Sequence, residues 1–242
     1  MTTRFVILAA PRTGTNTLVA QLCAQPDIWC HGEILKRGKV PIKRPGEKLK
    51  EKLLKLREQD FDAFLARAFT LSKSRPHCGF KILLAHLNEQ NTPPILDDPG
   101  ILKIVLFRSN ILANYASTLT AKETGAWNPQ NMSKTQRPLV EFRPARFKQF
   151  RALYEERYRG IFERLAANGQ NPFRLHTDEL NNASRIEALL AFLGAETAVA
   201  TREMLPGGGS SDILSRFTNP ARVEQYLRAH KLMHWAQEGP AS

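Results

Sequence analysis

Apolar runs typical of buried strands alternate with helical patterns along most of this chain. Residues 5–10 are a continuous apolar run, and residues 103–107 are apolar after Lys103; both segments predict strands buried in a parallel sheet. Shorter strand-like segments lie at residues 28–32, 78–84 and 173–176. Apolar positions at helical spacing predict helices over residues 16–25, 60–71, 109–123, 142–168 and 184–194. This alternation predicts an α/β fold in which a central parallel sheet is flanked by helices.

Glycine and proline mark the ends of several predicted elements. Gly194 follows an apolar helical pattern and is expected to form its C-cap. Asn219 and Pro220 are expected to begin a last helix, with the asparagine as cap and the proline at the first helical position. Residues 124–140 are polar and contain glycine and proline, which predicts a loop, and residues 206–211 read as a flexible link.

Length and charge refine this picture. A chain of 242 residues that is 42% hydrophobic suits a single domain spanning residues 1–242. The net charge is +12, and residues 36–57 supply eight of these charges, because they hold ten basic residues against Glu47 and Glu51. We therefore predict a basic loop and helical insertion over residues 36–72 and a C-terminal extension over residues 206–242. Such an excess of basic residues indicates phosphate, sulfate, nucleic acid or an anionic membrane surface as a partner.

The cysteines and the N-terminus favour a cytoplasmic protein without metal. Cys23, Cys30 and Cys78 are odd in number and form no C-x-x-C pair, which argues against a disulfide framework and a thiolate zinc site. Cys30 is followed by His31, but no second histidine or cysteine group lies at ligand spacing. The first apolar run ends at Pro11 and is too short for a secretory signal, and no stretch is long enough to span a bilayer.

The strongest chemical signal is the turn PRTGTNT, residues 11–17, between the first predicted strand and the first predicted helix. Ligands of open parallel sheets bind at the carboxyl ends of strands, and a helix N-terminus presents free N–H groups to an anion. A glycine in the turn lets the backbone approach the anion closely, an arginine adds a permanent charge, and hydroxyl and amide side chains add donors. The predicted anion-binding residues are Arg12, Thr13, Gly14, Thr15, Asn16 and Thr17. The alternative is an ordinary strand–helix turn capped by Thr15 or Asn16.

Two familiar nucleotide motifs are absent from the turn. A Walker A loop needs a second glycine followed by lysine, but the turn has one glycine and no lysine precedes Lys36. The dinucleotide fingerprint G-x-G-x-x-G is missing too. A nucleotide kinase with a degenerate phosphate loop remains an alternative. So does a nucleic-acid or membrane-binding protein, although residues 36–57 lack interleaved aromatic residues and no recognised nucleic-acid motif occurs.

The turn PRTGTN resembles the 5′-phosphosulfate loop of the sulfotransferases that depend on 3′-phosphoadenylyl sulfate (PAPS). Residues 104–118, IVLFRSNILANYAST, resemble the 3′-phosphate motif of that family, in which an arginine ends a strand and a serine lies two turns into the next helix. The resemblance assigns these roles to Arg108 and Ser117. In the family the arginine usually precedes the serine by eight positions, whereas here that offset falls on Ser109 and Arg108 is one residue further back.

Shorter stretches point to bacterial carbohydrate sulfotransferases, among them the trehalose sulfotransferase type. CHGEI, GFKI, TGAW and HTDEL all resemble segments of these enzymes and occur in the same order. The resemblance implies a three-layer P-loop-like fold, with PAPS as co-substrate, 3′-phosphoadenosine 5′-phosphate (PAP) as product and no metal. It implies an acceptor hydroxyl on a carbohydrate or glycolipid, with contact to an anionic membrane surface as a further option and no nucleic-acid partner.

A sulfuryl acceptor must lose a proton, so a base is needed within hydrogen-bond reach. Glu33 follows the second strand and would lie beside the turn if the first two strands were neighbours; the resemblance also implicates a glutamate in this region. His31 and His86 are the alternatives. Lys81 lies in an apolar stretch, so it either faces a polar cleft, where it could offset charge on the leaving oxygen, or snorkels from a sheet edge. Arg216 could also reach the nucleotide.

The basic residues 36–57 follow directly after Glu33. Their first positions must therefore lie near the proposed reacting centre, and we expect the stretch to border the acceptor entrance.

Overall fold

The computed structural model describes five ranges of the chain, residues 2–42, 46–72, 74–127, 137–196 and 211–238. Parts of several predicted segments lie outside them, namely residues 43–45 of the basic stretch, 128–136 of the predicted loop, and 206–210 and 239–242 of the C-terminal extension. The chain forms two compact units. The first comprises Met1–Phe107 and Arg159–Glu203, and the second comprises Arg108–Tyr158 and Met204–Ser242. The single-domain organisation stays a prediction.

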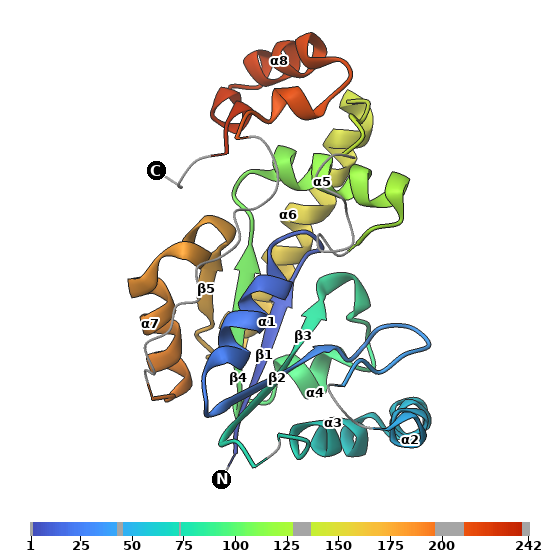
Figure 1. Cartoon of the computed structure of the whole chain (residues 1–242), viewed down its shortest axis with the longest axis vertical. Coiled ribbons are helices and arrows are strands. Elements are labelled where there is room, and N and C mark those ends of the chain that lie inside the picture. The colour runs from blue at the N-terminus through green and yellow to red at the C-terminus, as the bar shows by residue number, and fades with distance from the viewer. Residues whose placement is uncertain (1, 43–45, 73, 128–136, 197–210, 239–242) are drawn as a thin grey trace. The chain divides into compact units, whose positions relative to one another are not determined.

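The first unit contains a sheet of five parallel strands in the order β2-β3-β1-β4-β5 (Figure 1). Its strands are β1 (Thr3–Ala9), β2 (Ile28–Glu33), β3 (His77–Leu83), β4 (Ile101–Phe107) and β5 (Phe173–His176). Each strand falls where an apolar run predicted one, and β5 has the predicted bounds. The central strand β1 is buried from Phe5 to Ala9, as its continuous apolar run indicated.

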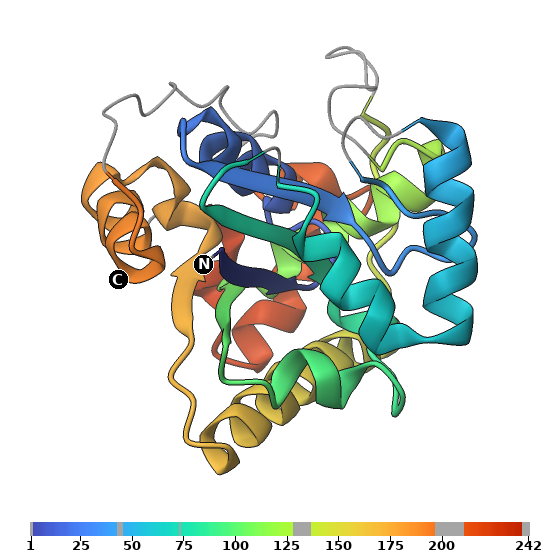
Figure 2. The same ribbon diagram turned by 90° about the horizontal axis from the view of Figure 1, so that it is seen from below.

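Helices flank this sheet, which confirms the predicted α/β fold. They are α1 (Thr15–Ala24), α2 (Glu47–Gln59), α3 (Phe61–Phe69), α4 (Thr92–Leu96) and α7 (Ala183–Leu193). Figure 2 shows α1 and α4 on opposite sides of the strands. The short α4 was not predicted, since two prolines break its pattern. The α7 helix ends at Gly194 in the left-handed conformation, which confirms the predicted C-cap.

Packing inside the sheet depends on one glycine. Gly79 on β3 lies opposite Phe5 on β1, and a Cβ atom built on Gly79 would come within 2.4 Å of the Phe5 ring. The phenylalanine ring therefore fills the space that any larger residue at position 79 would need. This contact explains why a glycine occupies an interior strand, where it is otherwise unfavourable.

The second unit contains α5 (Ile111–Thr124), α8 (Pro220–Ala229) and the first part of α6 (Pro144–Ala167). Its core is a cluster of aromatic rings, Tyr115, Phe142, Phe147, Phe217 and Tyr226.

The predicted start of α8 is confirmed, because Asn219 is its N-cap residue and Pro220 is the first helical residue. In the described part of the chain, however, no hydrogen bond joins the Asn219 side chain to the helix start. Its amide instead accepts from the Phe142 N–H at 2.9 Å and donates to the Phe142 carbonyl at 3.0 Å. The Asn219 side chain thus bonds to Phe142, a residue distant in sequence, and not to the helix N–H groups that the local capping rule predicted.

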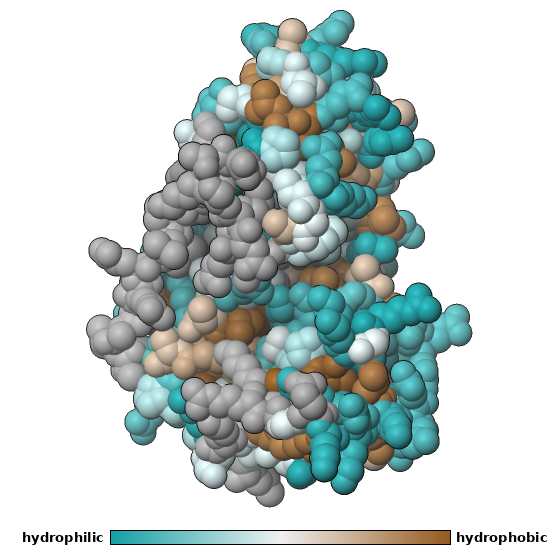
Figure 3. Space-filling view, turned by 45° about the vertical axis from the view of Figure 1, so that its right-hand side comes forward, coloured by the Kyte–Doolittle hydropathy of each residue, from teal (hydrophilic) through white to brown (hydrophobic). Residues whose placement is uncertain are grey.

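Hydrophilic residues cover much of the described surface on the face shown in Figure 3. Among the described residues, no helix combines the length and the apolar character that crossing a membrane requires. The same residues contain no group of three or more histidine, cysteine, aspartate or glutamate side chains that could hold a metal ion.

Candidate functional site

The turn after β1 leads directly into the start of α1. β1 ends at Ala9, and α1 begins at Thr15 with Gly14 as its N-cap residue. No side chain in the described part of the chain caps this helix start, so the alternative of a cap by Thr15 or Asn16 is wrong. An N-terminus without a side-chain cap leaves backbone N–H groups that an anion can accept from.

The backbone of this turn is unusual at two positions. Arg12 has φ of 66° and Gly14 has φ of 84°, both in the left-handed region. Few non-glycine residues adopt such a conformation, and it recurs where function requires a special geometry. A Cβ atom on Gly14 would lie 2.7 Å from the Leu180 side chain. The left-handed conformation therefore favours glycine at position 14, and any larger residue would also force the Leu180 side chain to shift.

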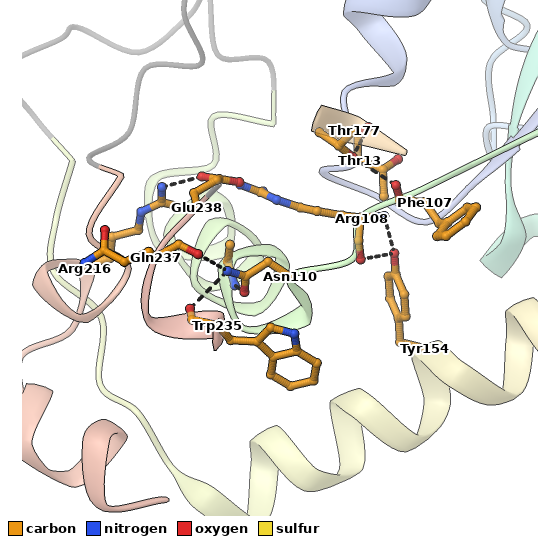
Figure 4. A network of polar contacts seen from close by, with 11 residues as sticks. Thr13, Phe107, Arg108, Asn110, Tyr154, Thr177, Arg216, Trp235, Gln237 and Glu238 are labelled. Carbon is orange, nitrogen blue, oxygen red and sulfur yellow. Dashed lines mark hydrogen bonds and ion pairs between the residues drawn. The ribbon is translucent and has the colours of Figure 1, made fainter. Parts of the chain in front are cut away.

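Thr13 and Thr177 hold the turn in place (Figure 4). The buried Thr13 hydroxyl donates to the Ala10 carbonyl at 2.9 Å. The Thr177 hydroxyl lies within 2.9 Å of the Thr13 carbonyl and 3.2 Å of the Phe107 carbonyl, so it links the turn to the end of β4. Thr177 belongs to the HTDEL stretch, for which the resemblance to known enzymes implied no role. We infer that Thr177 is a positioning residue for the turn.

Two further threonines lie in the first turn of α1. Thr15 is 8% exposed, and Thr17 is half-buried, with its N–H donating to the Gly14 carbonyl at 3.0 Å. Asn16 between them is exposed. Of the residues Thr15, Asn16 and Thr17, the asparagine therefore has the side chain that is most accessible.

Lys81 connects the turn to Glu33. The Lys81 ammonium lies 3.0 Å from the Glu33 carboxylate and 2.5 Å from the Asn16 side-chain oxygen. Lys81 is only 8% exposed and lies on β3, an interior strand between β2 and β1, so the alternative of a snorkelling edge lysine is wrong. The lysine is paired with two oxygen acceptors, as a buried ammonium requires.

Glu33 does not reach the turn in the way the sequence suggested. β2 and β1 are not neighbours, because β3 lies between them. The register between β2 and β3 shifts after His31, so that Glu33 rather than Gly32 lies opposite Lys81. A shift of one residue reverses the side of the sheet that a side chain faces, and this bulge therefore puts Glu33 on the side of Lys81.

The two histidine alternatives for the base differ in exposure. His31 is fully buried in β2, beside Trp29, which leaves no accessible surface for an acceptor. His86 is half-buried in the 3₁₀ helix that follows β3. Burial lowers the pKa of His86. The nearby carboxylate of Glu33 opposes this effect, whereas the positive charges of Lys36 and Arg57 add to it. His86 is therefore within electrostatic reach of Glu33, and among the described residues its buried Nδ1 atom has no hydrogen-bond partner.

Arg57 of α2 fixes the loop that follows Glu33. Its guanidinium donates to the carbonyls of Ile34, Lys36 and Lys39 at 2.5, 3.1 and 3.0 Å. Burial lowers the pKa of Arg57, and Glu58 opposes that effect. In the sequence Arg57 is only one of ten basic residues at positions 36–57, because a loop that gathers three carbonyls around an arginine has no sequence pattern.

Arg108 begins the second unit, directly after β4. Its backbone N–H donates to the Tyr154 hydroxyl at 2.8 Å, and that hydroxyl lies 3.2 Å from the Arg108 carbonyl. Its guanidinium forms an ion pair with Glu238 (Figure 4). Ser117 lies two turns into α5, as predicted, and is half-buried.

Arg216 joins the same carboxylate. Its guanidinium lies 2.7 Å from the second Glu238 oxygen, so one glutamate binds both Arg108 and Arg216. Burial lowers the pKa of Arg216 to about 10; Arg137 acts in the same direction and Asp212 opposes it. The structure thus brings Arg108 and Arg216 together at one anionic group. The sequence did not indicate Glu238, which lies 130 residues after Arg108 and 22 residues after Arg216.

A pocket lies near the amino ends of β4 and β5, opposite to the carboxyl ends where the candidate site lies. It is lined by the start of β4, including Lys103, and by residues 169–172, which precede β5. Ligands of open parallel sheets bind at the carboxyl ends of the strands, so this pocket is not part of the candidate site.

An open parallel α/β sheet with a turn between its first strand and an uncapped helix start is an arrangement in which ligands bind at the carboxyl ends of the strands. The chain is 27% identical to nodulation protein H of Rhizobium tropici over 205 residues, which cover 79% of this chain and 75% of that protein. Together with the motifs, this similarity supports the PAPS-dependent sulfotransferase family and sulfuryl transfer as the general activity.

The remaining comparisons add little to this assignment. No family model matches the chain. A crystal structure of a sulfotransferase from Alicyclobacillus acidocaldarius aligns over 97% of this chain and 99% of that chain, with a TM-score of 0.47 and 16% identity. An alignment at that level does not identify an activity.

Proposed function

We propose that this protein transfers a sulfuryl group from PAPS to an acceptor hydroxyl on a carbohydrate or glycolipid in the cytoplasm. The observation that carries the proposal is the placement of Lys81 between the turn and Glu33, within 2.5 Å of Asn16 and 3.0 Å of the carboxylate. A cation, a candidate base and an anion-binding turn are thereby gathered in the first unit. Transfer of a charged group between two oxygens needs this combination of positioning and charge stabilisation.

In the proposed mechanism the turn at residues 11–17 holds the 5′-phosphosulfate. Glu33 takes the acceptor proton as the acceptor oxygen forms its bond to sulfur. The bond between sulfur and the bridging phosphate oxygen breaks, and its electron pair stays on that oxygen, where Arg12 and Lys81 offset the charge. Arg108 and Ser117 hold the 3′-phosphate. The cations are side chains, so the scheme uses no metal.

The nucleotide is tested by thermal unfolding with three ligands. PAP should raise the unfolding temperature, because a ligand that binds only the folded state stabilises it. ATP with magnesium should stabilise a kinase instead, and a nucleic-acid or membrane-binding protein should respond to neither nucleotide. Stabilisation by ATP with magnesium but not by PAP would reject the sulfotransferase proposal.

The 3′-phosphate contact is tested by comparing PAP with adenosine 5′-monophosphate. Arg108→Ala and Ser117→Ala should weaken PAP binding, by roughly ten- to a hundredfold for the arginine, because a hydrogen bond to a charged group is lost. Binding of the monophosphate, which lacks the 3′-phosphate, should change little. Calorimetry measures both affinities, and an equal loss for the two ligands would show that these residues do not read that phosphate.

We also propose that the basic stretch, residues 36–57, borders the acceptor entrance and attracts an anionic acceptor or membrane surface. Lys48, Lys52 and Lys55 are exposed on α2, whereas Arg57 is committed to the loop after Glu33. Lys43 and Arg44 lie outside the described residues.

Replacing Lys48, Lys52 and Lys55 together by serine should raise the acceptor KM and leave PAP affinity nearly unchanged. The effect should fade with salt, since exposed charges are screened over about 10 Å at 0.1 M ionic strength. The control makes the same change in net charge at other exposed lysines, Lys122, Lys148 and Lys231. Equal acceptor kinetics for the two triple variants at low salt would remove the proposed role.

A further inference from the structure

Glu238 binds two arginines that a phosphate group could bind equally well. One carboxylate oxygen contacts the Arg108 guanidinium, and the other lies 2.7 Å from the Arg216 guanidinium. The side chains of Arg108 and Arg216 are 12% and 17% exposed, so water solvates them poorly. Arginine pairs bind carboxylate and phosphate oxygens with the same planar N–H groups.

The charged groups around Arg108 and Arg216 also favour an anion with more negative charge than a carboxylate. Arg137 acts on Arg216 as a third positive charge, and Asp212 acts on it as a second negative charge beside Glu238. A phosphate monoester carries nearly two negative charges at neutral pH, whereas a carboxylate carries one, so phosphate neutralises the pair more completely.

The backbone holds Glu238 at this place independently of its side chain. Its N–H donates to the Ser211 carbonyl at 2.7 Å, and the backbone of Gln237 forms an isolated antiparallel β-bridge with that of Asp212. The Asn110 side chain donates to the Gln237 carbonyl at 3.0 Å (Figure 4). The segment can therefore stay in place while the Glu238 side chain, which is 33% exposed, turns away into water.

We propose that Glu238 is an internal competitor for the phosphate that Arg108 and Arg216 bind, so that a ligand must displace its carboxylate. This inference rests on the proposed function for the identity of the ligand, a nucleotide with a 3′-phosphate. It makes Glu238 a specificity-determining residue. A nucleotide without the 3′-phosphate has no group that displaces the carboxylate, so it gains nothing from the arginine pair.

The test is Glu238→Gln, which keeps the side-chain length but removes the competing charge. PAP affinity should rise by roughly tenfold, the lower end of what a hydrogen bond to a charged group contributes, and affinity for adenosine 5′-monophosphate should stay the same. Glu141→Gln is the control, because Glu141 also pairs with an arginine in the second unit but is exposed. Weaker PAP binding by Glu238→Gln would show that Glu238 positions the arginines instead, and an equal gain for both nucleotides would exclude competition at the 3′-phosphate.

Inorganic phosphate separates this inference from the proposed function. Phosphate should raise the unfolding temperature of Glu238→Gln more than that of the wild type, whichever nucleotide the protein uses. If PAP binds neither protein but this difference persists, the proposed function fails and the competition stands. If phosphate stabilises both proteins equally while PAP binds both with the same affinity, the competition fails and the proposed function stands.

Discussion

Replacing Glu33 by glutamine is expected to lower turnover roughly 10²–10⁴-fold while PAP affinity stays nearly unchanged. Glutamine has almost the same shape and can still accept a hydrogen bond from Lys81, which lies 3.0 Å from the carboxylate. It cannot take a proton from the acceptor. Steady-state kinetics with labelled PAPS and a carbohydrate acceptor measure the turnover, and calorimetry measures the affinity for PAP.

Two further variants test whether a loss of turnover in Glu33→Gln is specific to a base at this position. Glu89→Gln makes the same chemical change at an exposed position and should leave turnover intact. His86→Gln tests the other base, because His86 is half-buried and within electrostatic reach of Glu33. Near wild-type turnover in Glu33→Gln, together with a large loss in His86→Gln, would place the base at His86.

Replacing Arg12 by alanine is expected to weaken PAP binding about ten- to a hundredfold, because a hydrogen bond from a charged donor to the phosphosulfate is lost. Alanine keeps a Cβ atom, so the left-handed backbone at φ of 66° is equally demanding for both residues. The change therefore removes the guanidinium without relaxing the turn. Calorimetry on both proteins measures the difference in affinity.

Arg157→Ala is the matched control for this experiment. Arg157 is an exposed arginine of α6, and its loss changes the net charge by the same amount. PAP affinity should respond to Arg12 alone. If both variants bind PAP as tightly as the wild type, the turn at residues 11–17 does not hold the nucleotide through Arg12.

Much of the fold could be predicted from local patterns. The apolar runs marked all five strands, and the bounds of β5 were predicted residue by residue. Gly194 was recognised as a C-cap because a left-handed residue after a helix favours glycine regardless of the rest of the protein. Asn219 shows the limit of such rules: it occupies the predicted cap position of α8, but its side chain bonds to Phe142, far away in sequence, and not to the helix start.

The candidate site was predicted less completely. The turn at residues 11–17 could be recognised because strand, glycine turn and helix are contiguous in sequence. The link between that turn and Glu33 could not, because it depends on β3 lying between β2 and β1 and on the register shift after His31. Thr177 and Arg57 were missed for the same reason, since both act on backbone carbonyls of distant segments.

The sequence by itself determined the alternation of strands and helices, the place of the turn between β1 and α1, and the residue types available for chemistry. These properties follow from hydrophobic periodicity and from backbone preferences of neighbouring residues. The tertiary structure alone decided that Lys81 joins Asn16 to Glu33 and that Glu238 joins Arg108 to Arg216. Strand order, register and the return of a distant segment depend on the packing of the whole unit, and no short stretch of sequence carries that information.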